Sequence, residues 1–290
     1  MSEPQVFVST GGFRMTPASA VRELRSAGIT HIELSGGLPE PALLDRIREE
    51  AGDASLQVHN YFPPPAQPFV FNLCDPDPVG RERSLHFACE AIELSSALGA
   101  SAYAFHAGFL GTPGVGDLGR TWNVDNKLGL DEGMAIFAES VGRVHEHASR
   151  FGVELLIENN VLTRGTADAN GADVLLMTDP KGIREVLALL PPGMHMLLDV
   201  AHLRVSASTL GFDPVDALSQ LEGLIGGYHL SDNDGLVDSN ESVTEDSWFW
   251  DHLDRSVAFA TIEVNPGPTQ NYAGQVALVE RLLAVADAGE

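Results

Sequence analysis

Residues 194–202 read Met-His-Met-Leu-Leu-Asp-Val-Ala-His, and the rest of the fold can be worked out from this stretch. It follows the turn signal Pro191-Pro192-Gly193, and its apolar run continues up to Asp199. A short apolar run after a turn is typical of a buried, parallel strand. Asp199 at the strand end and His202 in the next loop would suit a divalent cation, because carboxylate oxygen and imidazole nitrogen often bind such ions together. The alternative is that Asp199 caps the next helix and His202 is a surface residue.

Short apolar runs alternate with amphipathic segments along the whole chain. We expect strands at residues 5–10, 31–35, 56–62, 102–106, 153–159, 194–200, 227–230 and 259–264. We expect helices at residues 18–27, 41–51, 77–98, 131–150, 180–190, 214–224, 248–253 and 271–286. Strict alternation predicts parallel strands joined by right-handed crossovers, and about 250 residues is typical of a closed barrel. We therefore predict that residues 1–290 form a single α/β domain, a (β/α)8 TIM barrel, with an open doubly wound sheet as the alternative.

The composition argues against a nucleic-acid partner and against a membrane partner. The chain has 290 residues, 44% of them hydrophobic, and a formal net charge of −24. Nucleic acids are bound by basic faces, which this charge disfavours. No apolar run approaches the roughly 20 residues of a membrane helix, and residues 1–10 do not resemble a signal peptide. The two cysteines, Cys74 and Cys89, are expected to be free thiols in a reducing cytoplasm.

One glycine pattern has the spacing of a dinucleotide-binding loop but not its context. It consists of Gly114, Gly116 and Gly119. No strand directly precedes it, no helix begins after it, and Asp117 would face the pyrophosphate. We expect a mobile loop here and no nucleotide cofactor.

Polar residues gather where the predicted strands end. A barrel places its active site on the face where the C-terminal ends of the strands emerge. The residues expected there are His59, Asn60, His106, Glu158, Asn159, Asn160, Asp199, His202, His229, Asp232 and Glu263. Any one of them could be an ordinary structural residue, but an unpaired carboxylate in a buried strand is costly. So many acids and imidazoles on one rim predict a metal site.

Four of these residues are the expected metal ligands: Glu158, Asp199, His229 and Glu263. Three carboxylates and one imidazole form a mostly hard site, which favours Mn²⁺, Mg²⁺ or Co²⁺, with Zn²⁺ as an alternative. The expected substrate contacts or outer ligands are His59, His106, His202, Asn160 and Asp232.

Several segments are expected to shape the pocket. Residues 108–130 are long and glycine-rich, as a lid would be, and residues 161–178 are similar. Trp248 and Trp250 could stack on a sugar ring, or they could pack onto the barrel. Arg164 and Arg204 are the nearest candidate phosphate contacts, but no phosphate motif is visible. The apolar helix at residues 135–144 could serve a homodimer or the outer layer of the barrel.

The ordered set of these residues resembles a known family. It runs through His106-Ala-Gly108, Glu158-Asn159, Asp199-x-x-His202, His229-Leu-Ser-Asp232 and Glu263. The chain looks like the xylose isomerase-like barrels, the sugar phosphate isomerase/epimerase superfamily that also includes endonuclease IV-type enzymes. In its ketose epimerase branch, the positions matching the four expected ligands bind one divalent metal, and the two glutamates exchange protons with the substrate. The resemblance implies a small carbohydrate as substrate.

The endonuclease branch fits less well. It uses three zinc ions and a further Asp-x-His after strand seven, where this chain has Asp238-Ser-Asn240. That departure and the charge of −24 argue against DNA repair. They leave open a second metal around His59, His106 and Glu158.

The chemistry of the residues favours a sugar isomerase or epimerase. A metal can polarise a carbonyl and stabilise an enediolate, while Glu158 and Glu263 are the expected catalytic residues that remove and return the proton. The alternatives are a metal-dependent hydrolase or lyase acting on a phosphodiester, glycoside or lactone, and a non-catalytic barrel that binds a sugar or regulates a partner.

Overall fold

The computed structural model describes residues 4–117, 122–124, 126–267 and 270–284, and it contains a closed barrel of eight parallel strands. The strands are β1 (Gln5–Ser9), β2 (His31–Ser35), β3 (Ser55–His59), β4 (Ala102–His106), β5 (Glu154–Glu158), β6 (His195–Asp199), β7 (Ile225–Leu230) and β8 (Phe259–Ile262). The helices are α1 (Pro17–Ser26), α2 (Leu43–Ala51), α3 (Pro78–Leu98), α4 (Leu130–Phe151), α5 (Arg164–Asn170), α6 (Pro180–Leu187), α7 (Val200–Leu210), α8 (Pro214–Leu221) and α9 (Tyr272–Ala284), with 3-10 turns η1 (Val115–Asp117) and η2 (Trp250–His252).

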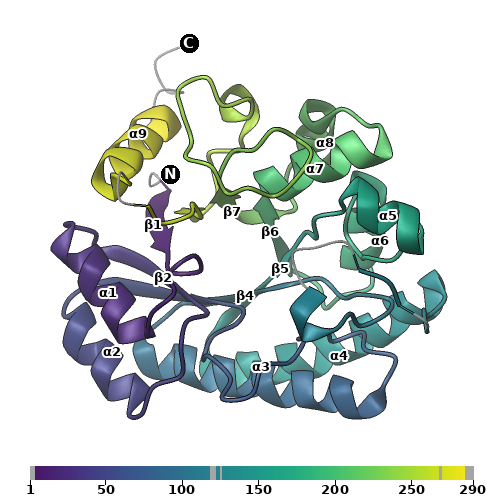
Figure 1. Ribbon diagram of the computed structural model, residues 1–290, viewed down its shortest axis with the longest axis horizontal. Helices are drawn as coiled ribbons and strands as arrows, with labels where there is room; N and C mark the ends of the chain where they lie inside the picture. The colour runs from purple at the N-terminus through teal and green to yellow at the C-terminus, as the bar shows by residue number, and fades with distance from the viewer. Residues whose placement is uncertain (1–3, 118–121, 125, 268–269, 285–290) are drawn as a thin grey trace.

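The strands follow one another around the barrel in sequence order. The ring closes where β1 pairs in parallel with β8, with Phe7 opposite Thr261. The helices form an outer layer that follows the same order around the strands (Figure 1). The predicted (β/α)8 barrel is therefore confirmed, and the open sheet is excluded.

Alternate strand residues point in opposite directions and divide the apolar side chains into two groups. One large cluster lies between strands and helices and includes Val8, Phe105 and Leu198. A small separate cluster belongs to the opposite strand face and consists of Phe7, Ala102, Ala104, Leu156, Leu197 and Phe259. Because strand side chains alternate, this small cluster fills the lower interior of the barrel. The same inward face carries polar residues toward the strand ends.

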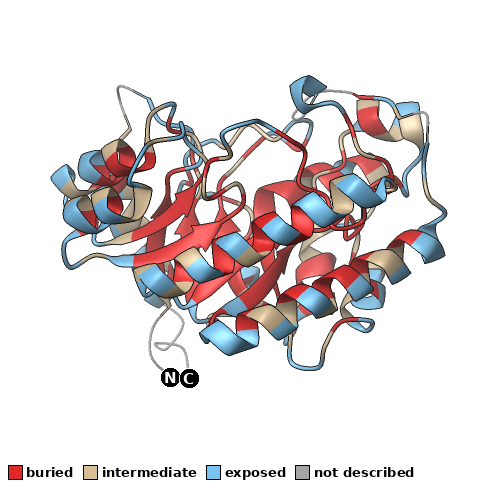
Figure 2. Cartoon of the chain, turned by 90° about the horizontal axis from the view of Figure 1, so that it is seen from below, coloured by how far each residue is buried: buried red, intermediate tan, exposed pale blue. Residues whose placement is uncertain are grey.

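The helices show the amphipathic pattern of an outer layer, with a buried stripe against the strands and an exposed stripe outside (Figure 2). In α4 the buried positions include Phe137, Val141 and Val144, so its apolar face serves the barrel layer. Helix α3 begins as its sequence predicts. The Asp77 side chain accepts a hydrogen bond from the Val79 N–H, and this N–H is one of the first-turn groups that have no partner within the helix.

Several boundaries differ from the sequence-based expectation. Strand β3 ends at His59 rather than at residue 62, and η2 replaces the expected helix at 248–253. Helices α5 and α7 were not expected. Around the glycine pattern only the short turn η1 forms, and Gly119 lies outside the described residues. In the described ranges, no helix is long and apolar enough to cross a membrane.

Candidate active site

The inward face of the strands turns from apolar to polar toward the C-terminal ends, and this change creates the candidate site. Phe7, Leu156 and Leu197 lie below, whereas the residues two positions further along the same strands, Ser9, Glu158 and Asp199, are polar. The inward polar residues at this level are Glu33, His59, His106, Glu158, Asp199, His229 and Glu263. Most are almost completely buried. The fold therefore concentrates acids and imidazoles in a space that water scarcely reaches.

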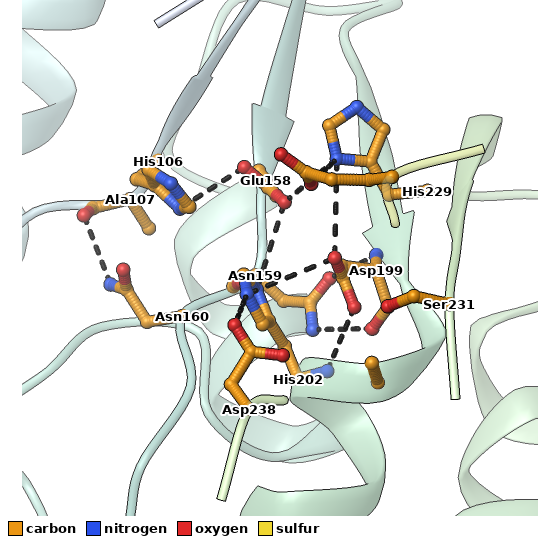
Figure 3. Close-up of polar contacts among 12 residues, drawn as sticks. His106, Ala107, Glu158, Asn159, Asn160, Asp199, His202, His229, Ser231 and Asp238 are labelled. Carbon is orange, nitrogen blue, oxygen red and sulfur yellow. Dashed lines mark hydrogen bonds and ion pairs between the residues drawn. The ribbon is translucent and has the colours of Figure 1, made fainter. Parts of the chain in front are cut away.

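The four expected metal ligands come together. His229 Nδ1 lies 2.7 Å from Glu263 Oε2, 3.2 Å from Glu158 Oε1 and 3.9 Å from Asp199 Oδ2. One oxygen or nitrogen of each residue lies within 4.8 Å of the others. Glu158, Asp199 and His229 have no exposed surface, and the Glu263 side chain is 20% exposed. Figure 3 shows Glu158, Asp199 and His229 converging from three neighbouring strands.

Three of the converging atoms lie close to one another but make no hydrogen bond of suitable geometry among the described residues: Glu158 Oε1, Asp199 Oδ2 and His229 Nδ1. Buried polar atoms are rarely left unpaired, because their desolvation is then uncompensated. All three atoms can act as electron-pair donors toward a cation. The residues present therefore fit a divalent metal ion.

Glu33 on β2 is a further member of the site that the sequence reasoning missed. Its Oε2 lies 3.0 Å from His229 Nε2 and accepts a hydrogen bond from Thr261 Oγ1 at 3.1 Å. If His229 donates its Nε2–H to Glu33, its Nδ1 is left free to face Glu158. This is the arrangement in which a carboxylate orients a metal-binding imidazole. The signal in the sequence was a glutamate inside the apolar strand His31-Ile-Glu-Leu-Ser.

Asp199 caps the next helix, as one interpretation of the sequence expected, and it also contributes an oxygen to the cluster. Asp199 Oδ1 caps α7 by accepting the His202 N–H at 2.8 Å, while its Oδ2 faces the cluster. His202 is therefore in the first turn of α7, not in a loop as expected, and it is buried rather than on the surface. Its Nδ1 lies 2.9 Å from the Asn159 carbonyl oxygen, and its Nε2 lies 3.3 Å from Asp238 Oδ2.

His59 and His106 lie on the other side of Glu158. Glu158 Oε2 is 2.7 Å from His59 Nε2 and 3.0 Å from His106 Nδ1. Two further groupings of close ligand atoms result, His59 with Glu158 and His229, and His106 with Glu158 and His202. Glu158 is thus common to all three groupings.

The electrostatics of the cluster depend on burial and on the surrounding opposite charges. Burial lowers the pKa of His106 to about 4, which keeps its ring neutral. Burial raises the pKa of Asp199 to about 7. Burial alone would also raise the pKa of Glu158, but the neighbouring histidines outweigh it and hold the value well below normal. For His229, burial lowers the pKa, yet Glu33, Glu263 and Glu158 together raise it well above its usual value. The raised pKa of His229 favours a proton on its ring, which a bound metal ion would have to displace.

Two cavities open beside the cluster. One, of about 280 Å³, is lined by small and polar residues that include Gly11, Ser35, His59, Glu263 and Asn265. The other, of about 330 Å³, is lined by His106, His202, Asp238 and a set of aromatic and aliphatic side chains. Asn60, Tyr61 and His106 line both cavities. Either space could admit a small molecule to the cluster.

The remaining expected substrate contacts differ in their placement. Asn160 lines the larger cavity, and its amide donates to the carbonyl oxygens of Ala107, Gly108 and Leu176. Asp232 lines neither cavity and pairs with Arg204 at 2.6 Å.

Trp248 and Trp250 line neither cavity. Trp250 is buried, and its indole N–H donates to the Thr244 carbonyl oxygen at 2.7 Å. Their geometry agrees with the packing alternative. The candidate phosphate contacts are also engaged elsewhere, because Arg164 donates to the Ser208 carbonyl oxygen and Arg204 pairs with Asp232.

The sequence matches a family described as Xylose isomerase-like TIM barrel over residues 21–262. No match was found among curated protein sequences.

Solved structures with the same fold include sugar epimerases. A D-tagatose 3-epimerase-like protein superposes with a TM-score of 0.74 at 15% identity, covering 98% of each chain. The 3-keto-D-glucoside 4-epimerase of E. coli gives 0.67 at 12% identity, covering 97% of this chain and 99% of its own. The TTHB071 protein from Thermus thermophilus, soaked with zinc chloride, gives 0.62 at 23% identity, covering 99% of both. At these identities the similarity establishes the fold.

Proposed function

The chain belongs to the xylose isomerase-like TIM barrel family, and from this premise we propose that it is a divalent-metal-dependent isomerase or epimerase of a small carbohydrate. The observation that carries the proposal is the group of buried, mutually facing atoms that make no hydrogen bond of suitable geometry among the described residues, Glu158 Oε1, Asp199 Oδ2 and His229 Nδ1. Structural neighbours named as a D-tagatose 3-epimerase-like protein, a D-psicose 3-epimerase and a 3-keto-D-glucoside 4-epimerase support the substrate class.

Glu158, Asp199, His229 and Glu263 would hold the ion. Their mostly hard donor set favours Mn²⁺, Mg²⁺ or Co²⁺, while Zn²⁺ remains chemically compatible. When bound, such an ion supplies Lewis acidity at a carbonyl and its neighbouring hydroxyl. Glu33 would keep the His229 ring oriented, because it lies within hydrogen-bonding distance of Nε2.

Glu263 is the residue best placed to take a proton from the substrate. Its carboxylate lines the polar cavity and is partly exposed. In this proposal it removes the proton from the carbon next to the carbonyl, as a general base.

Glu158 would supply a proton from the other side, after taking one from solvent, and Glu263 would then release to solvent the proton that it removed. Glu158 lines neither cavity, but its Oε2 lies 3.0 Å from His106, whose ring lines both. We therefore propose that His106 lies between Glu158 and the substrate. Delivery to the same carbon gives epimerisation, and delivery to the neighbouring carbon gives aldose–ketose isomerisation.

Solvent deuterium exchange tests this function. The manganese-loaded protein is incubated in D₂O with a panel of ketoses, aldoses and sugar phosphates, and carbon-bound protons are followed by NMR. Loss of a signal next to a carbonyl, abolished by chelator and by Glu263→Gln, is the expected result. Glu40→Gln is the matched control, because Glu40 is also a buried glutamate but pairs with Arg46 outside the site. No exchange with any sugar would overturn the proposal.

A second function, a metal-dependent hydrolase, is favoured by one observation. The groupings around His59 and around His106 and His202 share Glu158 with the main cluster, and hydrolytic sites often use more than one metal. Metal content after dialysis separates the two functions. One tightly bound ion per chain supports the isomerase or epimerase, whereas two or more support the hydrolase.

A further inference from the structure

The larger of the two cavities has a wall that the proposed proton transfer does not use. We call it the aromatic chamber and define it by Tyr61, Phe71, Phe109, Trp122, Leu175 and Val237, which line it. His106 and His202 line its inner end, so the chamber is continuous with the candidate metal site.

The part of the chamber wall that contains Phe109, Trp122 and Leu175 is built by two chain segments that pair with each other. Phe109 forms a β-bridge with Leu175, and the Leu110 N–H donates to the Val174 carbonyl oxygen at 2.8 Å. Asn170 accepts from the Val124 N–H and donates to the Trp122 carbonyl oxygen. The chamber is therefore a built feature of the fold.

The aromatic rings are held in fixed orientations. Phe109 and Trp122 meet edge to face with their centroids 6.3 Å apart. Tyr61 packs edge to face on Phe71 at 6.5 Å, and its hydroxyl accepts the Phe71 N–H. Rings arranged in this way present apolar faces and edges to an occupant.

The polar groups in the chamber wall are mostly used within the protein. Asn160 donates to backbone carbonyl oxygens, and the Thr163 hydroxyl donates to the Thr166 hydroxyl at 3.1 Å. Asn60 and Asp238 also line the cavity, and each has one side-chain oxygen without a partner among the described residues. Along the aromatic part of the wall, however, a sugar hydroxyl would lose its water without gaining a partner. Lysine and arginine are absent from the described lining of both cavities, so the described wall offers no counter-charge to a phosphate.

We propose that the substrate is a carbohydrate with a carbonyl group in its sugar and an uncharged apolar group attached, such as the aryl or alkyl aglycone of a keto-glycoside, and that the apolar group occupies the aromatic chamber while the sugar faces the metal site. This inference rests on the proposed function and names its substrate class. An apolar group in this cavity would gain the hydrophobic contribution of the rings that line it. Burial of a phosphate there would be strongly unfavourable.

Titration calorimetry with the manganese-loaded protein tests the inference. The probes are phenyl glycosides of glucose, galactose and mannose, their methyl counterparts, and the matching sugar 6-phosphates. We expect at least one phenyl glycoside to bind ten or more times as tightly as its methyl counterpart and its 6-phosphate. Equal affinities in every pair, tighter binding of a phosphate, or no binding at all would overturn the inference.

Two variants locate the binding. Phe109→Ala should reduce the affinity for the phenyl glycoside at least fivefold and leave the methyl glycoside unchanged. Val237→Asp should also weaken phenyl binding, whereas Leu236→Asp should not. Leu236 and Val237 are neighbouring exposed residues, 65% and 55% accessible, but only Val237 lines the chamber. A phenyl preference that survives both Phe109→Ala and Val237→Asp would place the aglycone elsewhere.

The outcome is independent of the catalytic test. Deuterium exchange on a sugar without any preference for the phenyl group would leave the proposed function in place and remove the aromatic chamber as an aglycone site. A phenyl preference located by these variants, without exchange on any sugar, would retain the aglycone site and remove the isomerase or epimerase.

Discussion

In the proposed function, Glu33 sets which nitrogen of His229 faces the metal ion. Its carboxylate lies 3.0 Å from His229 Nε2, while His229 Nδ1 faces Glu158 and Glu263. A neutral imidazole has one N–H and one lone pair, so a hydrogen bond at one nitrogen fixes the role of the other. Glu33 thereby acts as a positioning residue.

Replacing Glu33 should therefore weaken metal binding without removing a ligand. We expect Glu33→Gln to lower the affinity for Mn²⁺ by about 10- to 100-fold, the usual effect of losing such a partner. Competition with a fluorescent chelator measures the affinity. Glu40→Gln should leave it unchanged, because Glu40 accepts from the Ala18 N–H and pairs with Arg46. An unaltered affinity in Glu33→Gln would show that the carboxylate does not orient His229.

The two cysteines should differ in reactivity for a physical reason. Cys74 is buried, and burial raises the pKa of its thiol to about 12, whereas Cys89 is partly exposed. The thiolate is the reactive form, so Cys74 should become more reactive as the pH rises toward 12. Peptide mapping after iodoacetamide treatment of the native protein at pH 8 should find the label on Cys89 first. If the Cys89→Ser variant were labelled as fast as the unaltered protein, Cys74 would have to be accessible.

At the level of elements, the strands were largely predictable and two of the helices were not. The strand ends carried Glu158, Asp199 and Glu263 as polar endings of apolar runs, which is a local signal. Helix α7 gave no amphipathic signal, because residues on nearly all its sides are buried. Helix α5, with the sequence Arg-Gly-Thr-Ala-Asp-Ala-Asn, contains few strong helix formers.

The site was only partly predictable for a related reason. Glu33 was missed because it lies two residues before the end of β2, so a search of strand ends passes over it. Its partner His229 is 196 positions away. Only the closed barrel brings the two strand faces together, and the sequence does not display that proximity. The division of the chamber wall between two paired loops is equally non-local.

The lower interior of the barrel depends on a pairing of large and small residues. A Cβ atom on Gly227 of β7 would lie 2.6 Å from the ring of Phe259, and Phe259 is buried with Phe7 and Leu197. Gly227→Ala should destabilise the protein by about 1–3 kcal/mol, as overpacking does. Gly142→Ala in α4 is the matched control, because its added Cβ meets nothing within 4 Å. It should be neutral or stabilise by about 0.5–1 kcal/mol. Urea unfolding measures both values, and equal effects would contradict this account of the interior.

For the whole molecule, the candidate metal site connects strands from both halves of the chain. Its acids come from β2, β5, β6 and just beyond β8, and without a cation their charges are compensated only by protons and histidines. An ion that binds only the folded state stabilises it by about 2.7 kcal/mol at 100 times its dissociation constant.

Chelator treatment should therefore lower the melting temperature, and Mn²⁺ should restore it. Salt alone also screens the net charge of −24 and can raise stability, so the comparison is made at equal ionic strength with NaCl. The double variant Asp199→Asn, Glu263→Gln should lose the response to Mn²⁺. A response retained in that variant would place the ion outside the cluster.

The closed barrel also predicts that the chain unfolds cooperatively. Residues 5–8 pair with residues 259–262, so the first strand has neighbours from both ends of the chain, and no half of the ring is complete without the other. We propose that the chain is a single domain, and it should then unfold in one transition, with calorimetric and van't Hoff enthalpies that agree. Replacing Phe7 by Asp would introduce an unpaired charge into the shared interior. The resulting loss of stability should lower the midpoint measured by tryptophan fluorescence and by circular dichroism equally. The tryptophans lie at positions 122, 248 and 250, far from β1 in sequence. If the circular dichroism midpoint fell and the fluorescence midpoint did not, the two ends of the chain would unfold separately.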